Sequence, residues 1–166
     1  MYTIISGTNR SKSNTIRVAE QYQSIFLDKG INANLVSLVH LDVSERNQDI
    51  VALEKGVLIP SKKIIFIAPE YNGSIPGVLK SLIDISDIES VWWGKRALIT
   101  GVSTGRAGNL RGLDHLTGIL QYVKMIVHPN KLPISAVDKL LNGEGMISDK
   151  ATLSAINLQV EEFISF

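Results

Sequence analysis

Two segments of the chain, residues 63–68 and residues 97–102, are rich in apolar residues and show no alternation of apolar and polar positions. A strand with one face in water alternates, whereas a strand covered by helices on both faces has no polar face. Strands covered in this way are typical of parallel sheets whose strands are joined by helical crossovers. The two segments therefore predict central strands of a parallel sheet in an α/β protein.

Strand-like and helical segments alternate along the rest of the chain. Three further strands are predicted, at residues 2–5, 34–38 and 125–127. Helices are predicted at residues 14–29, 47–59, 76–83, 110–120 and 149–164. This order predicts a doubly wound parallel sheet of five strands with helices on both faces, in the flavodoxin-like order 2-1-3-4-5. No linker or low-complexity tract interrupts it, so we expect a single domain over residues 1–166.

The segment Pro-Glu-Tyr-Asn-Gly-Ser-Ile-Pro-Gly at residues 69–77 directly follows the first of the two buried strands. In open α/β sheets, ligands bind outside the carboxyl ends of the strands, and this segment brings four polar side chains there on a backbone stiffened by proline. Pro76 suits the first turn of a helix, whose free N–H groups lie beside the same loop. The segment predicts a ring-binding loop, and a rigid turn with an exposed tyrosine is the alternative.

Residues 6–15, which join the first strand to the first helix, contain hydroxyls, amides and two cations. Backbone N–H groups at a helix amino terminus, short hydroxyl donors and an arginine that binds two oxygens suit a phosphate group. The spacing matches neither a nucleotide P-loop nor a dinucleotide-binding fingerprint, which argues against ATP and against NAD in a Rossmann-type site. Ordinary capping of the helix by Ser13 or Asn14 is the alternative.

A third polar loop, residues 103–109, follows the second buried strand. Gly105 and Gly108 let the backbone approach a ligand closely. The N–H groups around Thr104 and Gly105 can face a polarised ring edge, and Arg106 can add a positive charge there. The predicted topology brings this loop together with the other two, which favours a shared ligand site over the alternative of a solvated arginine on a glycine-rich turn.

The composition argues against several classes of function. Seventeen Lys and Arg are interspersed with sixteen Asp and Glu, and the net charge of +1 predicts no nucleic-acid partner. The chain has no cysteine, which excludes disulfides and thiolate catalysis. His40, His115 and His128 lack metal-ligand spacing, so we expect no metal and a surface or packing role for each. No secretory or membrane-spanning segment is recognisable, and we expect a cytoplasmic protein without a membrane partner.

With these residues the chain resembles the NADPH-dependent FMN reductase family, flavodoxin-like proteins that include quinone, azo-dye and chromate reductases. The resemblance spans nearly the whole chain, and residues 69–77 carry its most specific motif. Gly7, Arg10 and Ser13 match the family's Gly-Ser-x-Arg-x-x-Ser phosphate loop, in which Thr8 replaces a serine. Residues 40–60 match least.

The resemblance implies one non-covalent FMN per chain, with NADPH or NADH as the co-substrate. The residues implied to hold the FMN phosphate are Thr8, Arg10, Ser13, Asn14 and Thr15. Those implied to line the isoalloxazine are Pro69, Glu70, Tyr71, Asn72, Gly73 and Ser74, and those implied to close its pyrimidine side are Ser103, Thr104, Gly105 and Arg106. The resemblance further implies a small-molecule electron acceptor and a homodimer or homotetramer.

The implied activity is that of an NAD(P)H-dependent, FMN-containing oxidoreductase that reduces free flavin, quinones or similar small acceptors by a ping-pong mechanism. A flavin accepts hydride at N5, so no residue is assigned as a catalytic acid or base. Two alternatives stay open, a flavodoxin-like electron carrier without nicotinamide turnover and a non-catalytic module that binds a phosphate ligand. The balanced charge is atypical of carriers that dock through acidic surfaces. Trp92 and Trp93 fit a core or an interface better than a flavin cover.

Overall fold

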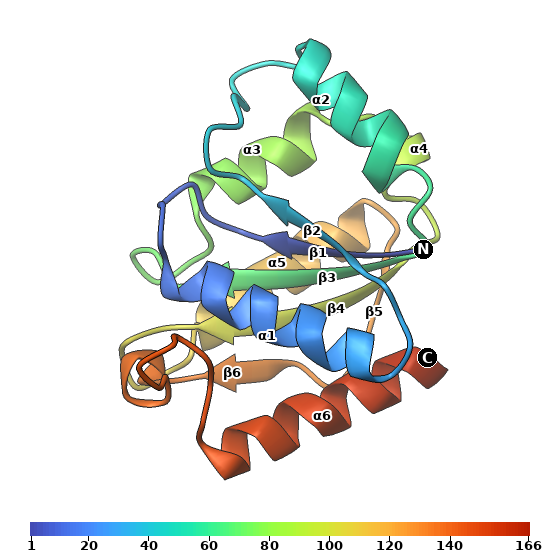
Figure 1. Cartoon of the computed structure of the whole chain (residues 1–166). Coiled ribbons are helices and arrows are strands. Elements are labelled where there is room, and N and C mark those ends of the chain that lie inside the picture. The colour runs from blue at the N-terminus through green and yellow to red at the C-terminus, as the bar shows by residue number, and fades with distance from the viewer.

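The computed structural model describes residues 1–166 and is built around a parallel sheet (Figure 1). Its strands are β1 (Tyr2–Ser6), β2 (Asn34–Ser37), β3 (Lys63–Pro69), β4 (Arg96–Val102), β5 (Ile126–Val127) and β6 (Leu132–Ile134). The strand order is β2-β1-β3-β4-β5, every pair is parallel, and β6 also pairs with β4. The predicted flavodoxin-like order 2-1-3-4-5 is therefore confirmed.

Helices cover both faces of the sheet. They are α1 (Asn14–Asp28), α2 (Gln48–Leu53), α3 (Gly77–Ile85), α4 (Ile88–Val91), α5 (Leu110–Tyr122) and α6 (Lys150–Ser165). Helices α1 and α6 pack on one face, and α2 to α5 lie on the other (Figure 1). The short helix α4 was not expected from the sequence. None of these helices combines the length and the apolarity required to cross a bilayer.

The fifth strand position differs from the prediction of one strand at residues 125–127. Two short segments, β5 and β6, occupy it and both pair with β4. Ala97 pairs with Val127 and Thr100 with Leu132, so residues 98–99 of β4 lie opposite the four residues 128–131. Pro129 lies in this bulge, where it has no N–H to donate to the sheet. This interruption divides the expected fifth strand into β5 and β6. Of the two, β6 pairs with the carboxyl-terminal half of β4.

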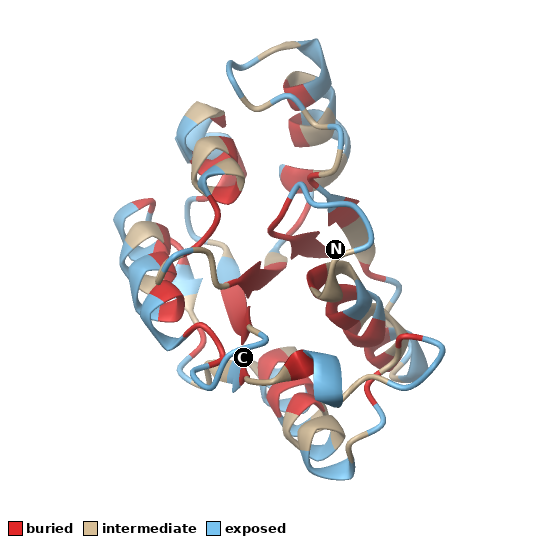
Figure 2. Ribbon diagram, turned by 90° about the vertical axis from the view of Figure 1, so that its left-hand side faces the viewer, coloured by how far each residue is buried: buried red, intermediate tan, exposed pale blue.

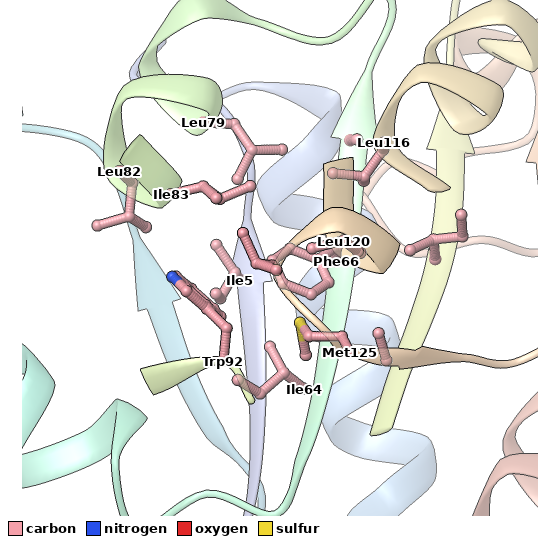
Figure 3. Close-up of a cluster of buried hydrophobic side chains, with 14 of the residues drawn as sticks. Ile5, Ile64, Phe66, Leu79, Leu82, Ile83, Trp92, Leu116, Leu120 and Met125 are labelled. Carbon is pink, nitrogen blue, oxygen red and sulfur yellow. The ribbon is translucent and has the colours of Figure 1, made fainter. Parts of the chain in front are cut away.

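Successive residues of the central strands enter opposite cores, which explains their lack of alternation. Ile64 and Phe66 belong to the core beneath α2 to α5, whereas Ile65 and Ile67 belong to the core beneath α1 and α6. Buried residues accordingly lie along the sheet and on the helix sides that face it (Figure 2). Trp92 is fully buried beside Phe66 in the first of these cores (Figure 3).

Trp93, in contrast, is 40% exposed, and the Lys124 ammonium lies 3.5 Å from its ring centroid. Neither tryptophan lines the cavity described below. Trp92 is thus a core residue, and the pair does not cover a ligand at the carboxyl edge.

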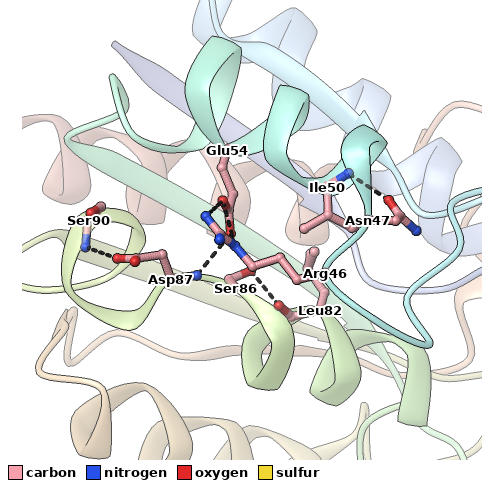
Figure 4. Close-up of polar contacts among 8 residues, drawn as sticks. All are labelled: Arg46, Asn47, Ile50, Glu54, Leu82, Ser86, Asp87 and Ser90. Carbon is pink, nitrogen blue, oxygen red and sulfur yellow. Dashed lines mark hydrogen bonds and ion pairs between the residues drawn. The ribbon is translucent and has the colours of Figure 1, made fainter.

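The predicted helix at residues 47–59 changes its hydrogen bonding halfway, because α2 continues into a π-helical turn at Glu54–Leu58. Glu54 is fully buried at this junction, where Arg46 Nη2 lies 2.6 Å from Glu54 Oε2 and the Asp87 N–H donates to Glu54 Oε1 (Figure 4). Burial, the largest influence, raises the pKa of Glu54, but these hydrogen bonds outweigh it and the pKa falls below its ordinary value. The ionised glutamate thus joins α2 to the start of α4.

Candidate functional site at the carboxyl edge of the sheet

Three loops meet beyond the carboxyl ends of β1, β3 and β4, on the left in Figure 1, and enclose a cavity of about 330 Å³. Nine of the residues predicted for the site line this cavity: Arg10, Ser13, Asn14, Thr15, Pro69, Glu70, Tyr71, Ser103 and Thr104. Thr8, Asn72, Gly73, Ser74, Gly105 and Arg106 were also predicted for the site but do not line this cavity. The topology thus brings the three loops together, with several of their residues set back from the cavity wall.

The loop between β1 and α1 presents an excess of hydrogen-bond donors to the cavity. The N–H groups of Ser11 and Lys12 make no hydrogen bond within the chain. The first N–H groups of α1 have no acceptor inside a helix either, and they carry the positive end of its dipole. Arg10 and Lys12 line the cavity without an ion pair, against one carboxylate, Glu70. This end of the cavity suits an anion.

Ser13 shows that the two interpretations of this loop are compatible. Its Oγ accepts a hydrogen bond of 3.2 Å from the Ile16 N–H and so caps α1. Because a hydroxyl also carries one hydrogen, Ser13 can cap the helix and donate to an anion at the same time. Capping therefore does not argue against a phosphate site here.

Tyr71 links the loop after β3 to the loop after β1. Its hydroxyl lies 2.6 Å from Thr8 Oγ1, and the Arg10 guanidinium carbon lies 4.3 Å from its ring centroid. Thr8 is only 1% exposed and lies behind the cavity wall, where its Oγ1 also accepts from the Arg10 N–H at 3.2 Å. Three residues predicted for one ligand are therefore already joined to one another.

The loop after β3 closes as a tight turn. Tyr71 and Ser74 exchange two backbone hydrogen bonds, of 2.9 Å and 3.1 Å, around Asn72 and Gly73. Both central residues have positive φ, 53° and 80°, which is the type I′ geometry that the sequence Asn-Gly favours. A Cβ at Gly73 would meet no atom within 4 Å, so the chain requires glycine here for its backbone angle.

The loop after β4 is held by Ser103, whose Oγ donates to the Gly105 carbonyl and accepts from the Gly108 N–H, both at 3.0 Å. The N–H groups of Thr104 and Gly105 make no hydrogen bond within the chain. Gly108 serves internal packing, because a Cβ there would lie 2.7 Å from the backbone of Pro133. The loop leaves two backbone donors free beside the cavity.

Asn109 is a site-shaping residue that sequence reasoning missed. It is fully buried, and its Nδ2 donates to the carbonyls of Ala68 and Pro69, both at 3.0 Å. A Cβ at Gly112 would lie 2.0 Å from Asn109 Oδ1, so this glycine makes room for the amide. Asn109 thus fixes the start of α5 to the end of β3.

Other residues near the cavity also went unpredicted. They are Ser11, Lys12, Val102 and Val137 on its wall. His115 Nδ1 lies 2.8 Å from Ser74 Oγ, but neither of these two residues lines the cavity. Ser11 and Lys12 could have been chosen from the sequence, since they lie inside the predicted phosphate loop. Val137 and His115 come from distant segments that only the folded chain brings near.

The strand order and the cavity at the point where that order reverses make this chain a flavodoxin-like protein. Residues 2–138 match the sequence profile of the NADPH-dependent FMN reductases. The chain therefore belongs to the NADPH-dependent FMN reductase family, as its resemblance indicated.

Curated relatives share local identity with the chain. A 2-hydroxy-1,4-benzoquinone reductase from Burkholderia sp. is 37% identical over 67 residues, which cover 39% of this chain and 37% of the relative. An NAD(P)H-dependent FMN reductase from Pseudomonas aeruginosa is 35% identical over 103 residues, covering 59% of this chain and 55% of the relative. The matches thus span about half or less of these relatives' own lengths.

Solved structures agree on the fold. The flavoenzyme NAD(P)H:(acceptor) oxidoreductase FerB from Paracoccus denitrificans has a TM-score of 0.80 at 21% identity, with 99% of this chain and 94% of that chain covered. A flavodoxin from the domain Archaea has a TM-score of 0.64 at 12% identity, with 99% and 97% covered. At these identities the comparison establishes the flavodoxin-like fold alone.

The family implies FMN, and the cavity fits such a group on its own chemistry. The unpaired cations and free N–H groups at the start of α1 suit a phosphate. The free N–H groups of Thr104 and Gly105 can donate to carbonyl and nitrogen atoms at a ring edge. A volume of about 330 Å³ lies within the range of small-molecule sites.

Proposed function

We propose that this chain is an NAD(P)H-dependent, FMN-containing oxidoreductase that reduces free flavin, quinones or similar small acceptors. The observation that carries the proposal is the cluster of unpaired donors at the start of α1, on the same cavity as the two other loops. The names of the two curated relatives, one a quinone reductase and one an FMN reductase, support the same class of acceptor.

FMN bound here would supply hydride and electron transfer, so the residues need only bind and orient it. We assign its phosphate to the end lined by Arg10, Ser13, Asn14 and Thr15, with Thr8 behind them. The backbone turn of residues 71–74 and the loop of residues 103–106 then flank the ring. The free N–H groups of Thr104 and Gly105 would stabilise negative charge that develops at the ring edge.

The unit that binds the cofactor is proposed to be a single domain over residues 1–166, in a cytoplasmic homodimer or homotetramer. A groove of about 700 Å³ between α3 and α5 supports a partner subunit, because Ile88 and Tyr122 on it are 42% and 85% exposed. Light scattering at several protein concentrations tests the assembly, and a monomer at all of them would contradict it.

Rapid mixing tests the activity. The FMN-loaded protein is mixed without oxygen with NADPH and, separately, with NADH, and loss of oxidised flavin absorbance is followed. We expect reduction by at least one nicotinamide, and parallel lines in double-reciprocal plots when a quinone is the acceptor, as a ping-pong mechanism requires. If the flavin stays oxidised with both nicotinamides over minutes, the reductase proposal is wrong and the electron-carrier alternative replaces it.

A matched charge variant controls for nonspecific electrostatics. Lys55 is an exposed lysine on the π-helical turn and makes no ion pair. Lys55→Gln removes one positive charge, as Arg10→Gln does, but at the opposite edge of the sheet. We expect FMN binding and nicotinamide oxidation to fall only for Arg10→Gln.

A further inference from the structure

Tyr71 reaches out of its own loop into the phosphate half of the cavity. The residue follows β3 and belongs to the segment expected to line a ring, yet its two main contacts come from the loop after β1. Its hydroxyl lies 2.6 Å from Thr8 Oγ1, and its ring lies beneath the Arg10 guanidinium at 4.3 Å. These contacts connect Tyr71 to the anion-binding end of the cavity.

The burial of Thr8 favours one direction for the hydrogen bond between the two hydroxyls, because its hydrogen has no acceptor other than Tyr71. Thr8 Oγ1 already accepts a hydrogen bond from the Arg10 N–H at 3.2 Å. In the bond between Thr8 and Tyr71, one of the two hydroxyls donates its hydrogen to the other. Thr8 is 1% exposed and absent from the cavity wall, whereas Tyr71 lines it. With Thr8 donating to the Tyr71 oxygen, the hydrogen of Tyr71 remains available to an anion in the cavity.

The ring of Tyr71 has a second effect, on Arg10. A guanidinium that stacks on an aromatic face loses little further freedom when the N–H groups at its edge bind a phosphate. Arg10 lines the cavity and forms no ion pair that would compete for those groups. The stacking therefore holds Arg10 ready for an anion.

We propose that Tyr71 is a phosphate-selecting residue, which makes this site prefer a phosphorylated flavin over an unphosphorylated one. The hydroxyl, supported by Thr8, donates to the ligand's phosphate, and the ring positions Arg10 for the same group. The inference rests on the proposed FMN site and adds to it a residue that discriminates FMN from riboflavin.

Titration of flavin fluorescence against FMN and riboflavin tests this selection. Tyr71→Phe keeps the ring and removes the hydroxyl, whereas Tyr71→Leu removes both contacts. We expect the affinity for FMN to fall about tenfold in Tyr71→Phe, as for one lost hydrogen bond to a charged group, and further in Tyr71→Leu. The affinity for riboflavin, which lacks the phosphate, should change by about twofold or less in Tyr71→Phe.

Thr8→Val provides a second variant that acts through the first. Thr8→Val also removes the acceptor of the Arg10 N–H, so it has a loss of its own, but it should weaken FMN binding less in the Tyr71→Phe protein than in the unmodified one. Equal effects of Thr8→Val in the two proteins would contradict the relay. Far-UV circular dichroism melting checks that each variant is folded at the titration temperature.

Equal losses for FMN and riboflavin in Tyr71→Phe would assign Tyr71 to the ring and overturn the inference. An FMN affinity that does not change in Tyr71→Phe would also overturn it. These outcomes leave the proposed function standing, provided that the unmodified protein binds FMN and is reduced by a nicotinamide. An unmodified protein that binds no FMN would instead refute the proposed function itself.

Discussion

The two edges of the sheet use their polar groups in opposite ways. At the amino edge, Lys63 Nζ donates to the last carbonyls of α6, at Phe163 and Ile164, and Lys95 Nζ donates to the carbonyls of Leu58 and Ile59. At the carboxyl edge, Arg10 and Lys12 form no ion pair, and several backbone N–H groups have no acceptor within the chain.

This difference indicates that polar groups at one edge of the sheet serve stability, whereas those at the other edge serve ligand binding. Cations at the amino edge satisfy the free carbonyls of helical ends, so their contribution is to folding. Donors at the carboxyl edge lie in loops that are held by the bonds of Thr8 with Arg10 and of Ser103 with Gly105 and Gly108, but their own capacity is unused. Substitutions at the two edges should therefore divide cleanly between loss of stability and loss of ligand binding.

The largest expected effect is on ligand binding at the carboxyl edge. Arg10→Met should weaken FMN binding by about 2–3 kcal/mol, because it removes charge-assisted hydrogen bonds to the phosphate. The free energy of unfolding without ligand should change by less than about 0.5 kcal/mol, as for a surface substitution. Fluorescence titration and urea unfolding measure the two quantities. A large loss of stability would show that Arg10 serves the fold.

Glu54, where α2 meets the π-helical turn, should show the opposite behaviour, a loss of stability without a loss of ligand binding. Glu54→Gln should lower the free energy of unfolding by about 2 kcal/mol at pH 7, because the bonds from Arg46 and the Asp87 N–H lose their charge assistance. FMN affinity should stay unchanged. Since hydrogen bonds lower the pKa of Glu54, its stabilisation is present above the ordinary value of 4.5 and is lost as the pH falls through the lowered pKa.

Urea unfolding of both proteins between pH 3 and pH 7 checks this linkage. The difference in stability between the unmodified chain and Glu54→Gln should shrink in acid. A difference that is constant across this range would mean that the ionised carboxylate contributes nothing.

Ser13 is where the separation should break down, because it both caps α1 and lies on the cavity. Ser13→Ala should cost about 1 kcal/mol of stability through the lost cap and should also weaken FMN binding. Ser13→Asp keeps a capping oxygen and so retains stability, but its charge repels a phosphate. Thermal melts and FMN titrations of both variants give the comparison. Normal FMN affinity in Ser13→Asp would exclude a phosphate at this end of the cavity.

Lys95 comes last because its effect is confined to alkaline pH, where it appears as a slope of stability against pH. Burial lowers the pKa of Lys95 to about 8. Between pH 8 and the ordinary value of 10.5, the unfolded chain retains a proton that the folded chain has lost, so the free energy of unfolding gains a rising contribution with pH. Lys95→Met should remove that contribution, as urea unfolding at several pH values would reveal. An identical slope in both proteins would contradict the assignment.

Much of the fold could be predicted from local patterns. The unalternating strands at residues 63–68 and 97–102, together with helical periodicity between them, are enough to indicate a doubly wound sheet. The split of the last strand into β5 and β6 was missed because its cause, a bulge around Pro129, depends on pairing with β4. The short helix α4 and the π-helical turn likewise depend on tertiary contacts, those of Glu54 with Arg46 and Asp87.

The three loops of the site could be predicted from the sequence, but the side-chain contacts that join them could not. Motif spacing places Thr8, Arg10 and Tyr71 at the carboxyl edge, yet no local rule says that the tyrosine hydroxyl meets the threonine or that the arginine covers its ring. Asn109 and His115 act across segments more than 30 residues apart, with bonds to Ala68 and Ser74. Such contacts follow from the packing of α5 on the sheet, which single-sequence patterns do not specify.

The central claim is that the carboxyl edge is a site for FMN, recognised through its phosphate. The most direct test is a titration of the purified, ligand-free protein with FMN, FAD and riboflavin, followed by flavin fluorescence and visible absorption. One FMN should bind per chain, more tightly than riboflavin or FAD, with an affinity that falls as inorganic phosphate is added. Preferential binding of FAD, or equal binding of FMN and riboflavin that phosphate does not affect, would contradict the claim.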